Sequence, residues 1–447
     1  MQNINTGDTA FVLISAALVL FMTPGLALFY GGMVRSKNVL GTIMHSFIII
    51  GIINVLWMLF GYSLAFGPDK FHLIGDLSWI GLRGVGMAPN TSYAPTIPHE
   101  AFMIFQAMFA IITPALITGA FAERMKFKSF LVFIIAWFVI VYIPVAHWVW
   151  GVGGWLRNLG VLDFAGGIVV HASSGAAALA AAIFVGKRKG FGTEPMIPHN
   201  IPLTIIGTGI LWFGWFGFNA GSALASGSLA ANAFVNTQVA ATAAIVSWTV
   251  VEWLRGGKPT TLGAATGAIA GLATITPAAG YVSPAAALLI GLAAGLVCYY
   301  AISLKFKFGY DDSLDVVGVH GVGGILGTLS VGLLASTAIN SAGANGLIHG
   351  NSSLIGIQAL GVFTVVVFSF IASLVIFKVV DKLFGVRVGE EDEITGLDLS
   401  QHSEIGYDLS GLGGSAGEFV TANAFSTQSS EVLSVSDETS LTPDNLP

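Results

Sequence analysis

Residues 163–171 read Asp163-Phe-Ala-Gly-Gly-Ile-Val-Val-His171, and residues 315–320 read Asp315-Val-Val-Gly-Val-His320. Both histidines stand in apolar, glycine-rich segments that are long enough to cross a bilayer. The charged form of an imidazole is unfavourable at membrane depth, so a histidine there usually faces a polar partner or a solute pathway. The two segments therefore predict a membrane-spanning protein whose histidines line a conduction route.

The composition of the chain agrees with this prediction. Of its 447 residues, 54% are hydrophobic and only 9% are charged, and the mean hydropathy is +0.81. Such a chain has too few charges to cover a soluble surface. A bilayer-crossing helix needs about 20 apolar residues, which predicts an all-α polytopic membrane protein with eleven transmembrane helices. We expect them at 9–33, 42–66, 101–122, 130–150, 165–186, 201–222, 237–255, 262–279, 284–303, 316–338 and 354–380.

The positions of lysine and arginine predict the orientation of these helices. Cytoplasmic loops carry an excess of both residues. Of the 18 in the chain, all but Lys70, Arg83 and Arg157 fall after the odd-numbered helices or in the C-terminal tail. We therefore expect the N-terminus outside and the C-terminus in the cytoplasm.

The two histidines also indicate an internal repeat. His171 lies in the fifth predicted helix and His320 in the tenth, so helices 1–5 and 6–10 would enter from opposite sides. We expect two inverted five-helix repeats plus helix eleven, with the histidines meeting near the midplane. Each histidine follows an aspartate at a helix start, eight residues after Asp163 and five after Asp315.

Five sequence blocks carry a resemblance to a known family. The blocks are Ala27-Leu-Phe-Tyr-Gly-Gly-Met-Val-Arg-Ser-Lys-Asn38, Gly119-Ala-Phe-Ala-Glu-Arg124, Asp163-Phe-Ala-Gly-Gly-Ile-Val-Val-His171, Gly214-Trp-Phe-Gly-Phe-Asn-Ala-Gly-Ser222 and Gly318-Val-His-Gly-Val-Gly-Gly324. They resemble the signature blocks of ammonium transporters, in the Amt branch of the Amt/Mep/Rh superfamily, and the resemblance runs in order from about residue 8 to about residue 410. The resemblance implies a homotrimer in the cell membrane, with a narrow hydrophobic pore in each subunit.

The resemblance implies a transport chemistry that suits such a pore. Ammonium and potassium are alike in charge and size, and moving a bare ion into low dielectric has an idealised cost on the order of 20 kcal/mol. Ammonium can lose a proton, whereas potassium cannot. A dry pore behind a recruitment site would therefore conduct ammonia, and the released proton would have to be either returned or conducted separately.

The same resemblance assigns roles to individual residues. It implies an external ammonium site at Phe109, Trp150 and Ser222, where cation–π attraction is worth about 2 kcal/mol or more when desolvated. Phe109 and Phe218 would form a gate below this site, because a hydrophobic constriction cannot replace the water of a hydrated ion.

The pore itself would be lined further in. The resemblance implies that His171 and His320 form a hydrogen-bonded pair that provides a polar track for ammonia and a relay for its proton. Trp215 and Thr276 match positions that line the pore region. Asp163 can cap its helix and is expected to support the outer vestibule electrostatically.

Several other polar residues have plainer interpretations. Glu123 and Arg124 are expected to form a local charge pair at a helix end. His45 is expected to be buried and hydrogen-bonded, and His147 is expected to be structural or solvated. Two histidines without a third ligand do not make a metal site. With no nucleophile–base set, the chain is expected to be a non-enzyme without cofactors and without a nucleic-acid partner.

The C-terminal part divides in two after the transporter domain at 1–384. Residues 385–410 resemble the cytoplasmic regulatory segment of the family, which packs under the trimer and in many relatives meets a PII-type regulatory protein. The stretch Ser403-Glu-Ile-Gly-Tyr407 departs from the more frequent Gly-Glu-x-Ala-Tyr. Residues 411–447 contain no lysine or arginine and are rich in serine and threonine, which predicts a disordered tail.

The expected function is an ammonium transporter that also admits methylammonium. Two alternatives stay open at this point. One is a passive channel for ammonia or small neutral gases, of the Rhesus type. The other is an ammonium sensor that signals through its tail.

Overall fold

The computed structural model describes residues 4–407 and consists almost entirely of helices. Ten helical segments in this range are long and apolar enough to cross a membrane: Thr6–Met33, Ser36–Phe66, His99–Ala120, Phe127–Leu159, Gly167–Val185, Ile201–Gly221, Ser228–Gly256, Pro284–Phe308, Val317–Leu334 and Ser353–Phe384. The expected span at 262–279 is a shorter apolar helix, Thr261–Ile275. The protein is thus a multi-pass helical membrane protein, while the count of eleven spans and their orientation stay predictions.

The first half of the bundle contains eight α-helices and a small hairpin. The helices are α1 (Thr6–Met33), α2 (Val39–Leu56), α3 (Tyr62–Phe66), α4 (His99–Ile117), α5 (Phe127–Trp137), α6 (Ile143–Trp150), α7 (Trp155–Leu159) and α8 (Ser173–Val185). Strands β1 (Asp69–Lys70) and β2 (Ile74–Gly75) pair antiparallel. Short 3-10 turns cover Ser36–Asn38, Ile80–Leu82 and Thr118–Ala120.

The second half continues the bundle and ends in a cap. Its helices are α9 (Ile201–Gly221), α10 (Ser228–Gly256), α11 (Thr261–Ile275), α12 (Pro284–Phe308), α13 (Val322–Leu334) and α14 (Ser353–Phe384), with a 3-10 turn at Leu347–His349. Two short helices, α15 (Glu390–Thr395) and α16 (Leu397–His402), follow α14.

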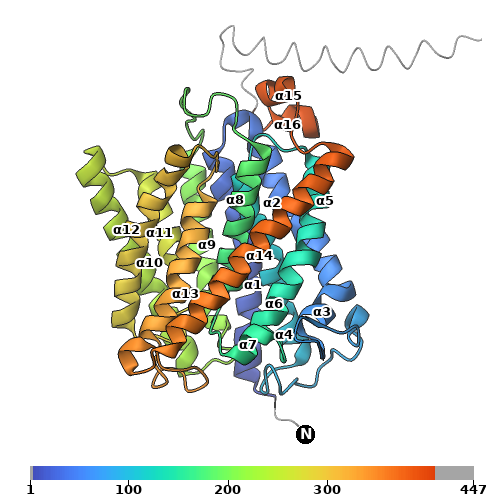
Figure 1. Ribbon diagram of the computed structural model, residues 1–447, viewed down its shortest axis with the longest axis vertical. Helices are drawn as coiled ribbons and strands as arrows, with labels where there is room; N and C mark the ends of the chain where they lie inside the picture. The colour runs from blue at the N-terminus through green and yellow to red at the C-terminus, as the bar shows by residue number, and fades with distance from the viewer. Residues whose placement is uncertain (1–3, 408–447) are drawn as a thin grey trace, which may run out of the picture.

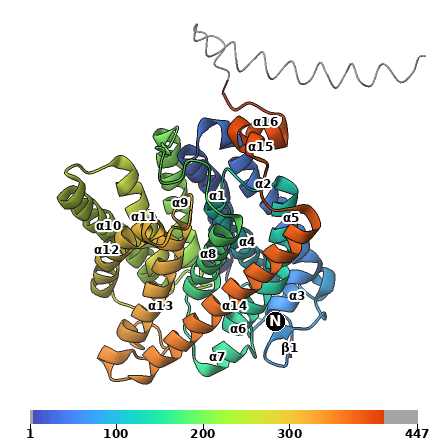
Figure 2. The ribbon, with the colours of Figure 1, turned by 45° about the horizontal axis from the view of Figure 1, so that its top comes forward.

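The bundle has two distinct ends. The N-terminal face holds the start of α1, α7 and the β1–β2 hairpin, and the C-terminal face holds α15 and α16 (Figure 1). Helix α14 runs obliquely along the outside of the bundle from one face to the other (Figure 1). Seen with the C-terminal face turned forward, α15 and α16 lie over the end of the bundle near α2 and α5 (Figure 2).

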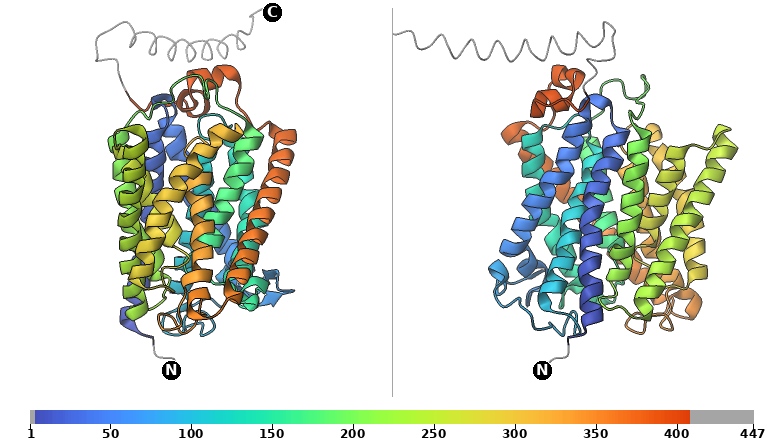
Figure 3. Two further views of the ribbon diagram at one scale, coloured as in Figure 1. Left: turned by 60° about the vertical axis from the view of Figure 1, so that its left-hand side comes forward. Right: turned by 180° about the vertical axis from the view of Figure 1, so that it is seen from behind.

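The first helices of the two halves, α1 and α9, run side by side (Figure 3). Glycine makes their close approach possible. A Cβ added at Gly207 would lie 2.3 Å from the backbone nitrogen of Phe29, and one at Gly214 would lie 2.2 Å from Cγ of Met22. Small residues at helix contacts let backbones approach closely inside membranes. The halves are therefore joined by direct packing of α1 on α9.

Helix α10 is longer than the hydropathy of the sequence predicted. The expected span was 237–255, but the helix begins at Ser228. The extra turns contain asparagines, and Asn236 donates hydrogen bonds to the carbonyl oxygens of Ala279 and Val282 at 2.8 Å each. Because these amides find partners within the protein, polar residues are tolerated there.

Both histidines singled out from the sequence lie in π-helical turns. One turn covers Gly167–Ala172 and leads into α8, and the other covers Val317–Gly321 and leads into α13. Two further π turns, Trp57–Gly61 and Phe138–Tyr142, precede α3 and α6. Such turns widen the helix locally and are frequent at functional sites. Hydropathy alone carries no signal for them.

The histidine-bearing segments approach each other through two glycines. A Cβ at Gly175 would lie 2.2 Å from Cα of Gly321. No side chain fits at that distance, so the glycine in α8 permits the contact with the turn that holds His320.

We expect the substitution Gly175→Ala to lower the thermal unfolding midpoint in detergent, because overpacking of this kind typically costs about 1–3 kcal/mol. The matched control is Gly356→Ala in α14, where an added Cβ meets nothing within 4 Å. That change should leave the midpoint unchanged or raise it, since alanine is the better helix former. Equal midpoints for the two variants would contradict the close contact.

Candidate functional site

Asp163 caps the segment that carries His171. Its Oδ1 accepts hydrogen bonds from the backbone nitrogens of Gly166 and Gly167 at 2.9 and 2.6 Å. Its Oδ2 accepts from those of Ile168 and Val169 at 2.8 and 3.1 Å. Burial raises the pKa of Asp163, and these four N–H groups oppose that shift. The capping role expected from the sequence is therefore present.

The second half has an equivalent cap, but it is not the aspartate that the sequence suggested. Asp312, rather than Asp315, accepts a hydrogen bond from the backbone nitrogen of Val317, at 2.7 Å from its Oδ2. Asp312 precedes His320 by eight residues, the same separation as in the first half. The equal spacing was the signal that could have identified it.

Asp315, at the same end of the bundle, pairs with a lysine instead of capping a helix. It has a positive φ of 61° and its Oδ1 lies 2.6 Å from Nζ of Lys305. Burial and the charge of Asp315 raise the pKa of Asp312 to about 6. The two aspartates therefore have separate roles, one as a cap and one as an ion-pair partner.

The two histidines meet as the repeat argument predicted. Their Nδ1 atoms are 3.2 Å apart and their ring planes are inclined by only 17°. Both side chains are buried, and Nε2 of His171 has no hydrogen-bond partner. The pair therefore shares one N–H···N hydrogen bond, and it retains a free ring nitrogen for a small polar solute.

Three spaces lie in series along the bundle. A cavity of about 590 Å³ is lined by Phe109, Trp150, Asp163 and Ser222, among others. A narrow space of about 10 Å³ is lined by Phe218, His171, His320, Trp215 and apolar side chains. A third space of about 50 Å³ is lined by His320, Asp315, Tyr30 and other residues.

Two phenylalanine rings separate the first space from the second. Phe109 lines the wide cavity and Phe218 lines the narrow one, and their ring centroids are 4.4 Å apart. A water molecule needs at least about 10–15 Å³ of such space. The segment below the rings therefore has room for no more than about one water, so a hydrated ion does not fit.

The residues assigned to ammonium recruitment come together on the wide side of these rings. Phe109 and Trp150 form an edge-to-face pair with centroids 5.8 Å apart. Nε1 of Trp150 donates a hydrogen bond to the carbonyl oxygen of Asp163 at 2.9 Å. Oγ of Ser222 donates to the carbonyl oxygen of Phe218 at 2.8 Å, which leaves its lone pairs available.

Trp215 and Thr276 lie together, though in different positions relative to the pore. Trp215 lines the narrow space and its ring stacks on His171 at 5.5 Å. Its Nε1 donates a hydrogen bond to Oγ1 of Thr276 at 2.9 Å. Thr276 is not among the residues that line the narrow space, and it contacts that space only through Trp215.

The expectation for His45 was only half right. Its side chain is buried, but its Nδ1 has no hydrogen-bond partner. The ring packs instead among Phe121, Phe127 and Phe130, with centroid distances of 6.0, 6.0 and 4.3 Å. Aromatic packing rather than a polar contact therefore holds this histidine.

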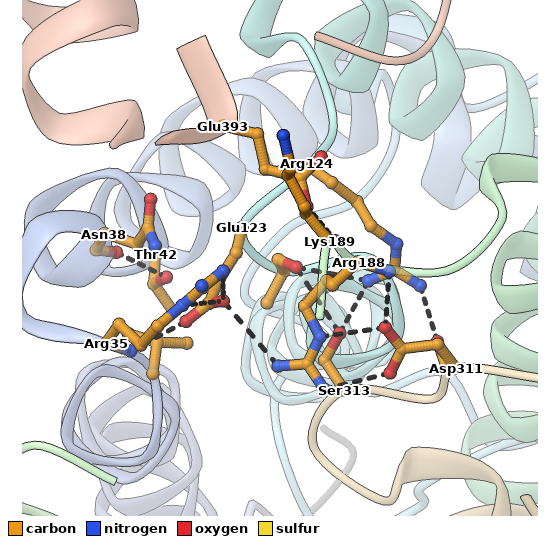
Figure 4. Close-up of polar contacts among 12 residues, drawn as sticks. Arg35, Asn38, Thr42, Glu123, Arg124, Arg188, Lys189, Asp311, Ser313 and Glu393 are labelled. Carbon is orange, nitrogen blue, oxygen red and sulfur yellow. Dashed lines mark hydrogen bonds and ion pairs between the residues drawn. The ribbon is translucent and has the colours of Figure 1, made fainter. Parts of the chain in front are cut away.

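The expected pair of Glu123 with Arg124 does not form. Glu123 has a positive φ of 73°, and its carboxylate faces Arg35, which contacts it at 2.5 Å, and Arg188 at 3.7 Å (Figure 4). Arg124 points elsewhere and donates hydrogen bonds to Oγ of Ser313 and to backbone carbonyl oxygens. Sequence neighbours thus serve two different parts of one polar network at the C-terminal face.

Arg188 and Asp311 are the centre of that network. The guanidinium binds both carboxylate oxygens at 2.9 Å, and the backbone nitrogen of Arg188 donates to the same carboxylate at 2.8 Å. Burial opposes ionisation of Asp311, but the hydrogen bonds from Arg188 and the charge of Arg124 outweigh it and lower the pKa of this carboxyl. The pair joins the loop after α8 to the segment before α13.

The C-terminal segment attaches to the same face. Glu393 accepts a hydrogen bond from the backbone nitrogen of Lys189 at 2.6 Å and one from Arg387 at 2.8 Å. Asp398 accepts from the backbone nitrogens of Leu40 and Gly41 at 3.0 and 2.8 Å, at the start of α2. The described part of the predicted regulatory segment, up to residue 407, is therefore bound to the start of α2 and to the loop after α8. The predicted tail at 411–447 lies outside the described residues.

Metal-binding groups do not gather anywhere in residues 4–407. No three histidine, cysteine, aspartate or glutamate side chains in this range lie close enough to hold a metal ion. The twin histidines face a narrow space lined mainly by apolar side chains.

Comparison with known proteins identifies relatives of the whole bundle. A family profile described as the Ammonium Transporter Family matches residues 10–407. An ammonium transporter of Bacillus subtilis is 55% identical over 402 residues, which cover 90% of this chain and 98% of that protein. The ammonium transporter Amt1 of Archaeoglobus fulgidus is 48% identical over 90% of this chain and 99% of its own.

Solved structures show the same similarity. Mep2 of Candida albicans superposes with a TM-score of 0.82 at 36% identity, over 87% of this chain and 88% of its own. A protein described as a Sensor Amt Protein superposes with a TM-score of 0.81 at 31% identity, over 89% of this chain and 98% of its own.

The ion pair at the C-terminal face leads to a stability prediction. We expect Arg188→Gln to lower the unfolding midpoint in detergent strongly, because removing one partner of a buried pair typically costs about 3–5 kcal/mol. Adding Asp311→Asn should recover most of the loss. The control is Lys189→Gln, whose pair with Glu390 is exposed to solvent and therefore contributes little to stability.

The same pair predicts a pH dependence. The pKa of Asp311 is lowered in the folded protein. Its contribution to the free energy of unfolding is therefore present at neutral pH and is lost as the pH falls from about 4 through the lowered pKa. The double variant Arg188→Gln with Asp311→Asn should lose less stability than the wild type over this pH range, because it has no carboxylate at position 311. A double variant that is as unstable as Arg188→Gln alone would contradict the pairing.

Proposed function

The chain belongs to the ammonium transporter family, and from this premise we propose that it recruits ammonium at the N-terminal face and delivers ammonia to the C-terminal face. The observation that carries the proposal is the series of three spaces, a wide one of about 590 Å³, a nearly closed one of about 10 Å³ and an exit space of about 50 Å³. A wide polar cavity can hold a cation, whereas the narrow one suits a small neutral molecule.

Recruitment would take place where aromatic rings and free oxygen lone pairs face the wide cavity. Ammonium would lie against Phe109 and Trp150 and donate an N–H bond to Oγ of Ser222. Cation–π attraction is worth about 2 kcal/mol or more when the cation is desolvated, and each retained hydrogen bond offsets part of the lost hydration. These contacts would replace some of the water around the ion before it reaches the gate.

Selection against potassium would follow from the dryness of the next segment. The rings of Phe109 and Phe218 close the passage, and a rotation of either side chain would admit a small solute. A potassium ion would lose its hydration there with no compensating ligand. Ammonium can leave its proton behind and continue as ammonia, so the filter acts through proton chemistry.

The histidine pair would provide the polar contacts below the gate. Ammonia can exchange hydrogen bonds with the free Nε2 of His171 and then with His320 as it moves through the narrow space. The N–H···N bond between the two rings offers a route for the released proton. Separate passage of ammonia and proton would make transport electrogenic.

The orientation and assembly belong to the same proposal. Lysine and arginine are concentrated at the C-terminal face, so this face would be cytoplasmic and the wide cavity external. Residues 1–384 would form the transporter domain of a homotrimer in the cell membrane, and residues 385–410 would regulate it, including through a PII-type protein. Methylammonium, which also carries a dissociable proton, would be a second substrate.

A sensory function is a second candidate. It is favoured by the likeness to the Sensor Amt Protein and by the bonds that tie Glu393 and Asp398 to loops of the transmembrane bundle. Such bonds would let a change in the bundle reach the C-terminal segment. The sensory role would be distinguished by a response that a deletion of residues 385–447 abolishes while ammonium uptake persists.

We expect Asp163→Ala to reduce ammonium uptake to the background of protein-free vesicles without loss of trimer assembly. Removing the carboxylate leaves four buried N–H groups without partners, each typically costing about 1–3 kcal/mol, and releases the segment that holds His171. Uptake into vesicles and size-exclusion chromatography measure the two effects. Normal uptake by a trimeric variant would refute the assigned role.

The electrical prediction separates the transporter from a passive channel. Ammonium added to liposomes that contain the purified protein should evoke a transient current, and potassium should not. His320→Ala should change or abolish this current, because it removes one ring of the relay. A rapid internal pH rise without current would instead favour the passive ammonia channel of the Rhesus type.

A further inference from the structure

His147 lies in the last turn of α6, three residues before Trp150, and its side chain is completely buried. Both of its ring nitrogens face oxygen atoms. Nδ1 is 2.9 Å from the carbonyl oxygen of Ala65, and Nε2 is 2.9 Å from Oδ1 of Asp69. Asp69 belongs to β1 and is itself only 21% exposed. The histidine therefore bridges α3 and the β1–β2 hairpin.

The chemistry of these contacts determines how many protons the pair holds. A carbonyl oxygen only accepts hydrogen bonds, so Nδ1 of His147 must carry a hydrogen. A neutral imidazole has no second N–H, and a bare Nε2 would place its lone pair against a carboxylate. One further proton must therefore lie between Nε2 and Oδ1, either on the ring or on Asp69. The pair as a whole is then neutral but can lose this proton.

The pair is joined to the turn that follows Trp150. The backbone nitrogen of Gly151 donates to the carbonyl oxygen of His147 at 2.9 Å. A Cβ at Gly153, where φ is +96°, would lie 2.5 Å from Cβ of Asp69. Because the turn folds directly against both members of the pair, a shift of either moves the backbone that carries Trp150.

A second side chain extends this contact. His72 lies 3.1 Å from Oδ2 of Asp69, and its Nδ1 donates a hydrogen bond to the carbonyl oxygen of Gly153 at 2.7 Å. Its backbone carbonyl accepts from the nitrogen of Trp155 at 3.2 Å. The two carboxylate oxygens of Asp69, one facing His147 and the other facing His72, therefore hold the hairpin against the turn after Trp150.

The other charged and titratable groups around the pair come from three elements. Lys70, in β1, pairs with Asp76 at 3.7 Å. Arg157, in α7, donates to the carbonyl oxygen of Trp150 at 2.5 Å. Tyr93 lies in the loop before α4. Burial raises its pKa to about 12, and the charges of Arg157 and Asp69 also act on it. His72 is therefore the further imidazole that contacts the Asp69 carboxylate.

We propose that His147 and Asp69 are a positioning pair for the external ammonium site, in which one shared proton holds Trp150 in its binding orientation. Loss of that proton as the external pH rises leaves the Nε2 lone pair facing a carboxylate, which loosens the turn and weakens cation binding. Apparent affinity thereby depends on external pH through this pair. The inference rests on the proposed function, because Trp150 is taken as part of the recruitment site.

The experiment measures uptake of radiolabelled methylammonium into vesicles from about pH 5 to about pH 9 outside, the range that brackets histidine titration. Methylammonium stays a cation over this range. In the wild type we expect the apparent KM to rise about threefold to tenfold toward high pH while Vmax changes less than about twofold. A change in Vmax alone would overturn the positioning role.

Two substitutions at one position separate the shared proton from the shape of the site. In the wild type, Oδ2 of Asp69 also accepts a hydrogen bond from the backbone nitrogen of His72 at 3.2 Å. Asp69→Asn can still accept this bond and can donate from its amide to an unprotonated Nε2, so it keeps both contacts with no shared proton to lose. Its KM should stay near the low-pH wild-type value at every pH. Asp69→Ala lacks both contacts, and its KM should be raised at every pH. A wild-type pH profile in Asp69→Asn would overturn the proposal.

His72 provides the matched control, because it contacts the same carboxylate but its side chain is 63% exposed. His72→Gln should retain the pH dependence of KM. If His72→Gln removes the dependence while Asp69→Asn keeps it, the titrating group is His72 and the proposal fails.

A measurement that does not depend on transport distinguishes failure of the positioning pair from failure of the proposed transport function. Hydrogen–deuterium exchange of residues 151–155, corrected for the intrinsic effect of pH, should be faster at high pH in the wild type, fast at every pH in Asp69→Ala and slow at every pH in Asp69→Asn. Absence of methylammonium uptake by the wild type would refute the proposed function, while these exchange rates would still test the pair. Equal exchange in all three proteins would overturn it.

Discussion

Two polar side chains can lie in the middle of this bundle only because the backbone that leads to each of them is capped. Inside a bilayer no water is available, so every backbone N–H group must find a partner in the protein. Asp163 provides this for four N–H groups before His171, and Asp312 does so for the segment before His320. The π turns, the contact between the histidines and the narrow space around them all depend on these two capped segments.

Close packing then turns the capped segments into a passage. The glycine contacts between α1 and α9, and between Gly175 and Gly321, bring the halves together so tightly that only about 10 Å³ remains beside the histidines. A space of this size excludes hydrated ions whatever their charge. The selectivity proposed here therefore comes from how little room the helices leave, combined with a cation site above the gate that retains part of the solvation.

Polar contacts at the two faces have different tasks. At the N-terminal face, Asp69 and His147 connect a hairpin to the turn that follows Trp150. At the C-terminal face, Arg188 and Asp311 join loops of the two halves, and Glu393 adds the C-terminal segment to them. A change in either network would reach the passage through the rigid helices between them, which is how binding outside and regulation inside could act on one pore.

The sequence alone determined the class of the protein and the approximate positions of ten long helices, and it singled out the residues of the proposed pore. Hydropathy over about 20 residues is a local property, and the signature blocks carry their chemistry in consecutive residues, so both could be recognised without a structure. The meeting of His171 with His320 was also predicted, because equivalent positions of the expected inverted repeats would come together.

Only the tertiary structure decided which polar groups pair. Glu123 turned to Arg35 rather than to its neighbour Arg124, Asp312 rather than Asp315 became the second cap, and His45 was buried without a partner at its Nδ1. Helix α10 began at Ser228 because its asparagines reach carbonyl oxygens of a distant segment. In each case the partner comes from another part of the chain, and the energy of a buried hydrogen bond depends on distances that only folding sets.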